Sequence, residues 1–294
     1  IRDRNALPQR SPHVVALGGG HGLAASLRAL RQVTPHLTAI VGVSDDGGSS
    51  GRLREQFDVV PPGDLRMALA ALCGDDTWGS TWARVLQHRF KSSGDLDGHA
   101  LGNLLITALW QETGDVVEGL DWVAKLLDAQ GRVLPLSTQP LEIVATVTDS
   151  SGHTREVQGQ SKVAVVTDHI DSIRLIPEQP KACPAALEAV ANADVLVLGP
   201  GSWFTSVLPH FHLPEMAQAL YNARAKRILV LNLTPQTGET HNYLAHDYLR
   251  DLITVHPEFR VDAVIADSSH VPNIAELNSL AESVGAVTIL AQVA

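Results

Sequence analysis

The chain of 294 residues contains 45% hydrophobic and 18% charged residues and carries a formal net charge of −10 at pH 7. This composition excludes disordered, collagen-like and coiled-coil proteins and is typical of a folded globular protein with an ample core. The negative charge repels phosphate backbones and anionic lipids, so we expect no nucleic-acid partner. The cysteines, Cys73 and Cys183, are too few for a disulfide framework, and no apolar run has the length of a membrane helix, so we expect a cytoplasmic protein without membrane insertion.

The first part of the chain alternates strands, glycine-rich turns and helices. After an N-terminal extension over residues 1–12, a buried strand is predicted over residues 13–17. It runs into the turn Gly18-Gly19-Gly20-His21-Gly22, and leucines at helical spacing follow. A second strand, residues 37–43, leads into a polar, acidic loop at the strand end where open α/β sheets place ligands. The segment Pro61-Pro62-Gly63-Asp64 then begins another helix.

The rest of the chain predicts an α/β domain with two additions. Residues 78–128 have a helical pattern and are expected to form an insertion that covers one face of the sheet or acts as a lid. Residues 133–176 show β alternation, with a hairpin turn at Ser151-Gly152, and predict an antiparallel excursion. Beyond it, strands and helices alternate again. We therefore predict a single α/β domain over residues 13–294, Rossmann-like, with a mostly parallel sheet and helices on both faces.

The first glycine turn is a candidate phosphate site. At Gly18-Gly19-Gly20-His21-Gly22, a bare backbone can bring N–H groups and a helix dipole onto a phosphate. The alternative is a tight turn that only lets the strand and the helix pack closely. The segment is not a P-loop, because no Lys-Ser or Lys-Thr pair follows, and Leu23 stands where a dinucleotide fingerprint has its third glycine. We favour phosphate binding by these five residues.

Three carboxylates are candidate metal ligands. Asp45 and Asp46 follow the second strand, and Asp64 lies at a predicted helix start. Mg²⁺ usually takes one or two carboxylates and completes its shell with substrate phosphate, so all three are expected to be available to Mg²⁺. The alternatives are a helix cap for Asp64 and a solvated turn for Asp45. The two adjacent acids also suit the ribose contact of a dinucleotide enzyme, which keeps an NAD-dependent oxidoreductase open.

Hydroxyl and basic side chains follow the acidic loop. The segment Gly47-Gly48-Ser49-Ser50-Gly51 matches the G-x-S-x-G pattern, but a nucleophile elbow needs a strand that runs straight into the turn. Two acids and two glycines intervene here, so a hydrolase is rejected. Ser49, Ser50 and Arg52 are instead interpreted as phosphate or hydroxyl contacts, with a solvated helix face as the alternative for Arg52.

Further polar groups occur at three places along the chain. His99 and Asn103, near a helix start, can reach a ligand or serve as caps. The loop Gly199-Pro200-Gly201-Ser202 follows another strand, and two such loops suit a ligand with a diphosphate. A third cluster could bind the base or the sugar of a nucleotide ligand: Asn232, Gln236, Gly238, Glu239 and Thr240. Tyr243, just beyond it, could stack on the ligand or simply pack in the core.

These motifs occur together, and in the same order, in a known family. The matching segments are 15–23, 44–54, 61–66, 98–103, 199–202 and 236–240. Through them the chain resembles the YvcK family of bacterial gluconeogenesis factors and, more distantly, CofD, the 2-phospho-L-lactate transferase of coenzyme F420 synthesis. One departure is His21, which replaces a usual threonine; its imidazole could donate to phosphate in place of the threonine hydroxyl.

The resemblance implies a CofD-like fold, a homodimer and binding of UDP-sugars, notably UDP-N-acetylglucosamine. It also implies a cytosolic protein tied to carbon metabolism, cell shape and peptidoglycan synthesis. In CofD, the acidic loop and a later aspartate hold Mg²⁺ beside the transferred phosphoryl group, and these positions fall on Asp45 or Asp46 and on Asp64.

We therefore expect a nucleotide-sugar-binding regulatory protein to which no catalytic residue is assigned. Its loops Gly18–Gly22 and Gly199–Ser202 are expected to hold the diphosphate of the ligand. Cell-envelope synthesis proteins are expected partners. The alternatives are a Mg²⁺-dependent phospholactate transferase of CofD type and, more remotely, an NAD-dependent oxidoreductase.

Overall fold

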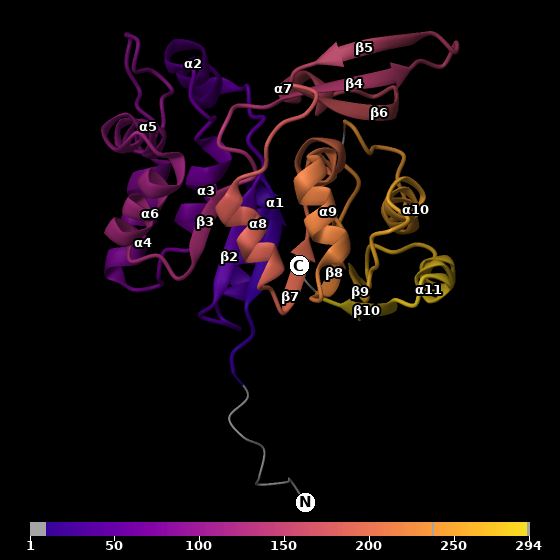
Figure 1. Ribbon diagram of the computed structural model, residues 1–294. Coiled ribbons are helices and arrows are strands. Elements are labelled where there is room, and N and C mark those ends of the chain that lie inside the picture. The colour runs from indigo at the N-terminus through magenta and orange to yellow at the C-terminus, as the bar shows by residue number, and fades with distance from the viewer. Residues whose placement is uncertain (1–9, 237, 293–294) are drawn as a thin grey trace, which may run out of the picture.

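A seven-stranded sheet forms the centre of the computed structural model, which describes residues 10–236 and 238–292 (Figure 1). Residues 1–9 of the expected N-terminal extension and Thr237 lie outside the described residues. The strands pair in parallel in the order β10-β9-β8-β7-β1-β2-β3. Their bounds are β1 Val14–Gly18, β2 Leu37–Val41, β3 Arg132–Pro135, β7 Val195–Leu198, β8 Lys226–Val230, β9 Ala263–Asp267 and β10 Val287–Ala291.

The strand order reverses between β1 and β7. From β1 the chain moves to β2 and β3, whereas from β7 it moves to β8, β9 and β10 on the other side. Because such crossovers are right-handed, the helices after β1 and after β7 lie on opposite faces of the sheet. Figure 1 shows α1 (Gly20–Leu30) behind the sheet and α9 (Pro214–Asn222) in front. Sheets of this type bind ligands at the carboxyl ends of the two strands beside the reversal.

Helices cover the sheet because its central strands are apolar on both faces. All five residues of β1 are buried, which is typical of a parallel strand with helices on each side. The covering helices present buried leucines or other apolar residues, such as Leu23 and Leu27 of α1. Other helices are α2 Gly48–Phe57, α3 Gly63–Ala71, α8 Pro184–Ala191, η1 Trp203–Val207, η2 Leu208–His212, α10 Ala245–Val255 and α11 Ile274–Ser283. The predicted Rossmann-like α/β class is confirmed.

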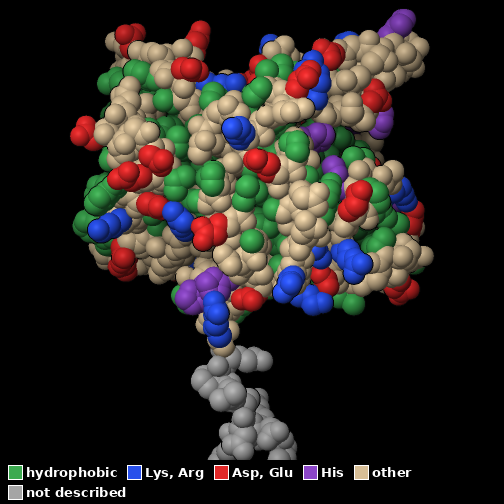
Figure 2. Space-filling model, in the orientation of Figure 1, with side chains coloured by type: hydrophobic (Ala, Val, Ile, Leu, Met, Phe, Trp, Pro, Cys, Tyr) green, Lys and Arg blue, Asp and Glu red, His purple; other side chains and the backbone are tan. Residues whose placement is uncertain are grey.

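The segment predicted as a helical insertion consists of three helices. These are α4 (Thr77–Gln87), α5 (Leu101–Thr113) and α6 (Val116–Leu127), which pack beside α3 and the β3 edge of the sheet (Figure 1). In Figure 2, acidic and basic side chains are interspersed over the visible face of the molecule. Within residues 10–236 and 238–292, no helix combines the length and apolarity that crossing a membrane requires.

A small antiparallel sheet lies above the carboxyl ends of the parallel strands (Figure 1). Its order is β5-β4-β6, with β4 Glu142–Thr148, β5 Thr154–Gln158 and β6 His169–Ile176, and the one-turn helix α7 (Gln160–Val163) follows β5. The turn at Ser151-Gly152 joins β4 to β5. The antiparallel part begins at Glu142 and not at residue 133, because β3 pairs in parallel with β2 and its apolar residues are buried in the main sheet.

Candidate functional site

The two predicted glycine loops contact each other at the point where the strand order reverses. Gly18–Gly22 follows β1, and Gly199–Ser202 follows β7. A Cβ atom on Gly22 would overlap the carbonyl oxygen of Pro200 and would lie 2.8 Å from the Cα atom of Gly201. Only glycine permits this approach of two backbones. The fold therefore brings together two strand-to-helix turns at the edge where a ligand is expected.

Asp64 faces the first glycine turn and does not cap its own helix. The N-cap of α3 is Pro62, and the cap position makes no side-chain hydrogen bond. The Asp64 carboxylate instead accepts a hydrogen bond from the Gly20 amide, and a Cβ atom on Gly19 would lie 2.6 Å from Asp64 Oδ2. The side chain thus occupies the position from which a cation could bridge to a ligand in the turn.

The surroundings of Asp64 favour its protonated form. Burial and the nearby charge of Asp45 raise the pKa of Asp64 to about 7, although the Gly20 amide and Arg66 oppose this rise. Arg66 is buried, donates to Gln87, and has a pKa of about 10 because burial lowers it. Sequence reasoning missed Arg66, although its place two residues after Asp64 in a matching segment was a usable signal.

Asp45 and Asp64 could together supply two oxygen ligands to a magnesium ion, whereas the Asp46 carboxylate accepts a hydrogen bond from another segment. Asp45 Oδ1 accepts from the Gly47 amide at 3.0 Å, and its other oxygen faces Gly63, the residue before Asp64. Asp46 Oδ1 accepts from the Ser161 amide in α7 at 2.8 Å. No group of three or more His, Cys, Asp and Glu side chains in the described part of the chain could hold a metal. Two carboxylates suffice where water and ligand phosphate complete the Mg²⁺ shell.

Ser49, His99 and Asn103 form a buried network between α2 and the start of α5. Ser49 Oγ accepts from Asn103 Nδ2 at 3.0 Å and from the Ala100 amide at 3.3 Å, so its own proton goes to His99 Nδ1 at 3.0 Å. Asn103 Nδ2 also lies 3.5 Å from Ser50 Oγ. Burial and the charge of Arg52 lower the pKa of His99, which keeps its ring neutral as an acceptor. These predicted ligand contacts hold the acidic loop in place.

The basic side chains of α2 also bind the protein itself. Arg52 donates to the carbonyl oxygens of Asp95 and Asp97, at 3.3 Å and 2.7 Å, and Arg54 donates to the carbonyl oxygen of Leu141. A hollow of about 720 Å³ opens beside them, lined by Asp46, Gly48, Gly51, Arg52, Arg54, Glu55, Asp58, Pro140 and Glu142.

The third polar cluster supports the second glycine loop. The Gly201 amide donates to Asn232 Oδ1 at 2.8 Å, and Asn232 Nδ2 donates to the Gly201 carbonyl oxygen at 2.9 Å. Gln236 Nε2 donates to Ser202 Oγ at 2.9 Å. Sequence reasoning assigned Asn232 to a base or sugar, but its amide is used by the loop. The hydroxyl of Ser206, a residue that follows the second glycine loop, approaches Gly19 of the first.

The remaining predicted residues pack behind this loop. Gly238 lies directly against the backbone of Ala164, just after α7. The Thr240 hydroxyl oxygen accepts from Tyr248 at 3.1 Å. Tyr243 donates to Asp251 at 2.5 Å, and burial together with this carboxylate raises the tyrosine pKa. Glu239 is buried beside η1. The segment therefore connects the second glycine loop to the antiparallel sheet above it.

Replacing Asn232 by aspartate is expected to distort the second glycine loop. The variant loses the Nδ2 donor and places a carboxylate oxygen against the Gly201 carbonyl oxygen, so the loop loses one hydrogen bond and gains a repulsion. We expect destabilisation of about 1–3 kcal/mol, measured by urea denaturation. Asn192→Asp, at an exposed position after α8, is the control. Equal stability of the two variants would show that the Asn232 clamp is dispensable.

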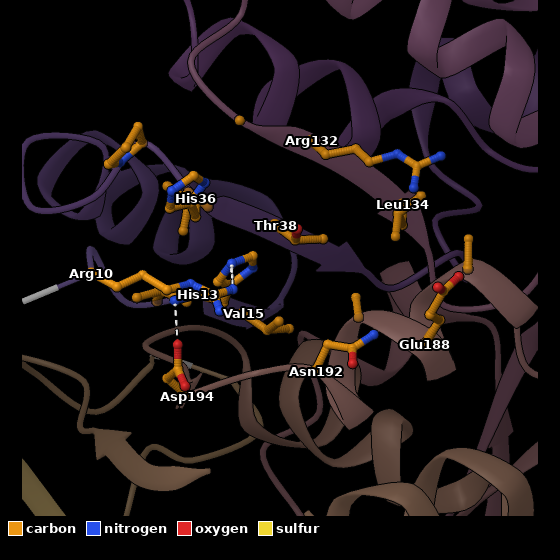
Figure 3. Close-up of a pocket in the computed structure, with 16 residues that line it drawn as sticks. Arg10, His13, Val15, His36, Thr38, Arg132, Leu134, Glu188, Asn192 and Asp194 are labelled. Carbon is orange, nitrogen blue, oxygen red and sulfur yellow. Dashed lines mark hydrogen bonds between the residues drawn. The ribbon is translucent and has the colours of Figure 1, made fainter.

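A separate hollow lies at the opposite edge of the sheet (Figure 3). It has a volume of about 670 Å³ and borders the amino ends of β1, β2 and β3. On its border the His13 amide donates to Asp194 Oδ2 at 2.8 Å, and Arg132 is held by Asp121. It contains none of the predicted ligand residues and is not part of the candidate site.

The fold and the site define a Rossmann-type α/β protein with paired glycine loops and a half-buried carboxylate pair at the strand-order reversal. The family model of 2-phospho-L-lactate transferase CofD matches residues 14–289, and the chain belongs to the CofD family. Its resemblance to the gluconeogenesis factors of the YvcK family is confirmed by relatives of that name.

Three comparisons illustrate this similarity. A Mycobacterium tuberculosis protein, provisionally called a gluconeogenesis factor, is 47% identical over 270 residues, which cover 91% of this chain and 79% of that protein. The gluconeogenesis factor of Listeria innocua is 38% identical over 264 residues, 90% of this chain and 80% of its own. A crystal structure of a Bacillus halodurans protein of the UPF0052 family has a TM-score of 0.85 and 33% identity, covering 97% of this chain and 93% of that chain.

Proposed function

We propose that this protein binds a nucleotide sugar of the UDP-N-acetylglucosamine type at the carboxyl ends of β1 and β7. The observation that carries the proposal is the contact between Gly22 and the Pro200-Gly201 backbone, which joins two glycine loops at one ligand position. Each loop leads into a helical turn whose first amides have no partner within that turn, and a diphosphate offers one phosphate to each turn.

The carboxylates beside the loops supply the second part of the proposal. A Mg²⁺ ion held by Asp45 and Asp64 would offset the charge of the diphosphate and bridge it to the protein. Arg66, buried next to this pair, already offsets part of its charge. Added Mg²⁺ is expected to tighten nucleotide binding. The Asp64 carboxylate is the group that couples Mg²⁺ binding to nucleotide binding.

The proposed role is regulatory and links carbon metabolism to cell shape and peptidoglycan synthesis. Support comes from the name gluconeogenesis factor carried by relatives and from the internal use of Ser49 and His99, which leaves neither as a free nucleophile or base. A homodimer and cell-envelope partners stay predictions, and sedimentation velocity tests the first of them.

Titration calorimetry with three ligands tests the binding proposal. We expect UDP-N-acetylglucosamine to bind more tightly than GDP or NADH, with Mg²⁺ present, and to be recovered unchanged by chromatography after hours of incubation. Preferred binding of NADH would favour a dehydrogenase and remove the nucleotide-sugar proposal.

The second candidate function is a phosphoryl-group transferase, which the family match favours. A transferase of this kind needs charge stabilisation at the transferred group, and the pair Asp45 and Asp64 with Mg²⁺ would provide it. The test is incubation with the deazaflavin acceptor and an activated phospholactate donor. Product formation at ordinary enzyme rates would establish the transferase in place of the regulator.

A further inference from the structure

Glu239 is a buried carboxyl group beside the second glycine loop. It lies in the turn after β8, is 4% exposed and faces the backbone amides of Trp203, Phe204 and Thr205 at the start of η1. These three residues directly follow Ser202, the last residue of the loop. Neither carboxyl oxygen of Glu239 forms a hydrogen bond of normal geometry with the described residues. The carboxyl group thus faces amides without being held by them.

Few charges surround this carboxyl group. η1 contributes the Thr205 hydroxyl and the amides, which lower the pKa, but no ionisable side chain. From α10, the Tyr248 phenol faces Glu239, whose charge helps to raise the tyrosine pKa. The acids Asp247 and Asp251 of the same helix hydrogen-bond elsewhere. Burial is the largest influence and raises the pKa of Glu239 to about 8, so the protonated acid predominates at neutral pH.

We propose that binding of a diphosphate ligand at Gly199–Ser202 is coupled to the uptake of one proton by Glu239. The inference rests on the proposed function, which places a phosphate at this loop. An ionised Glu239 presents a second anion to the amides of η1, which directly follow the loop. Protonation by solvent converts the carboxylate to a neutral acid, removes the repulsion and leaves the amides to the ligand.

Calorimetry in paired buffers tests the coupling on the intact protein. UDP-N-acetylglucosamine is titrated at pH 8, with Mg²⁺ fixed, in two buffers that differ in ionisation enthalpy. A nucleoside diphosphate sugar has no phosphate group that titrates near this pH, so proton exchange reports on the protein. We expect uptake of about half a proton per ligand, since about half of Glu239 is ionised at its pKa. Between pH 8 and pH 9, affinity is expected to fall by about fivefold, and by close to tenfold for each further pH unit.

Two variants identify the group that takes up the proton. Glu239→Gln should bind the ligand without proton uptake and with an affinity that no longer falls between pH 8 and pH 9. Asp251→Asn removes a neighbouring half-buried carboxyl group that accepts from Tyr243, and it should keep the uptake. If Glu239→Gln does not fold, as judged by circular dichroism, buffer-independent binding heats in the parent protein still overturn the coupling.

The outcomes separate this inference from the function on which it rests. Binding heats that do not depend on the buffer would overturn the proton coupling while leaving nucleotide-sugar binding intact. Uptake that persists in Glu239→Gln would assign the proton to another group and equally overturn it. Absence of binding at every pH, in the parent protein, would overturn the proposed function itself.

Discussion

Replacing Asp64 by asparagine is expected to stabilise the protein above pH 7 while weakening its response to Mg²⁺. The folded protein holds this carboxyl group with a pKa of about 7, against 3.8 for an ordinary aspartate. Between these values the folded state keeps a proton that the unfolded state releases, so the free energy of unfolding falls as pH rises from about 4 to 7. Asparagine does not titrate and avoids this loss.

The increase in the free energy of unfolding of Asp64→Asn over the parent protein reaches its full size above pH 7 and vanishes below pH 4. A shift of this size corresponds to about 4 kcal/mol, and the amide oxygen of the introduced asparagine can still accept from the Gly20 amide. Urea denaturation with a chelator present measures the effect from pH 4 to pH 8. Asp95→Asn, at an exposed position, should change nothing. An Asp64→Asn protein that is less stable at pH 8 would show that the carboxylate stabilises the fold.

A stabilising change at the half-buried Asp64 has a functional interpretation. Buried carboxyl groups with raised pKa values are costly to the fold and cluster at functional sites. Here the cost arises from burial and from the second acid, Asp45, on the neighbouring loop. A divalent cation between the two acids would offset both contributions. We therefore also expect that Mg²⁺ no longer increases the nucleotide affinity of Asp64→Asn.

The main elements of the fold could be predicted from local pattern. Continuous apolar runs followed by glycine turns predicted β1 and β7, and leucines at helical spacing predicted α1, since both signals depend on neighbours in sequence. The strand β3 was different. Its four residues, Arg132–Pro135, show neither a long run nor a turn signal that separates them from the antiparallel strands, and only pairing with β2 determines their sheet.

The location of the candidate site in the fold could be predicted, but the contacts among its residues could not. Motifs at strand ends located the glycine loops and acids, because parallel strands bring their carboxyl ends to one edge. Whether Asp45 or Asp46 is available to a metal ion depends on Ser161, which lies more than a hundred residues later in the chain. Its amide donates a hydrogen bond to the Asp46 carboxylate. Likewise, His99 meets Ser49 only through packing of α2 on α5. Such distant partners leave no pattern in the local sequence.

Replacing Gly20 by valine is expected to abolish nucleotide-sugar binding in a protein that still folds. Gly20 has φ of +58°, and a Cβ atom there would lie no closer than 4.0 Å to any side chain, with Asp64 Oδ1 the nearest atom. The new side chain therefore enters open space at the position where the glycine turn is expected to meet a phosphate. The left-handed backbone costs roughly 1–2 kcal/mol, which a domain of ordinary stability tolerates.

Gly114→Val separates backbone strain from obstruction of the ligand. Gly114 has φ of +69°, and no atom lies within 4 Å of its Cβ position, but it is the C-cap residue of α5 and belongs to neither glycine loop. Both variants should lose similar stability in urea, because both place a branched residue in the left-handed region. Calorimetry should then show parent-like binding of UDP-N-acetylglucosamine by Gly114→Val and a loss of at least a hundredfold by Gly20→Val, equivalent to about 3 kcal/mol. Parent-like affinity in a folded Gly20→Val protein would mean that no phosphate approaches this turn, and the ligand would have to lie against the second loop alone.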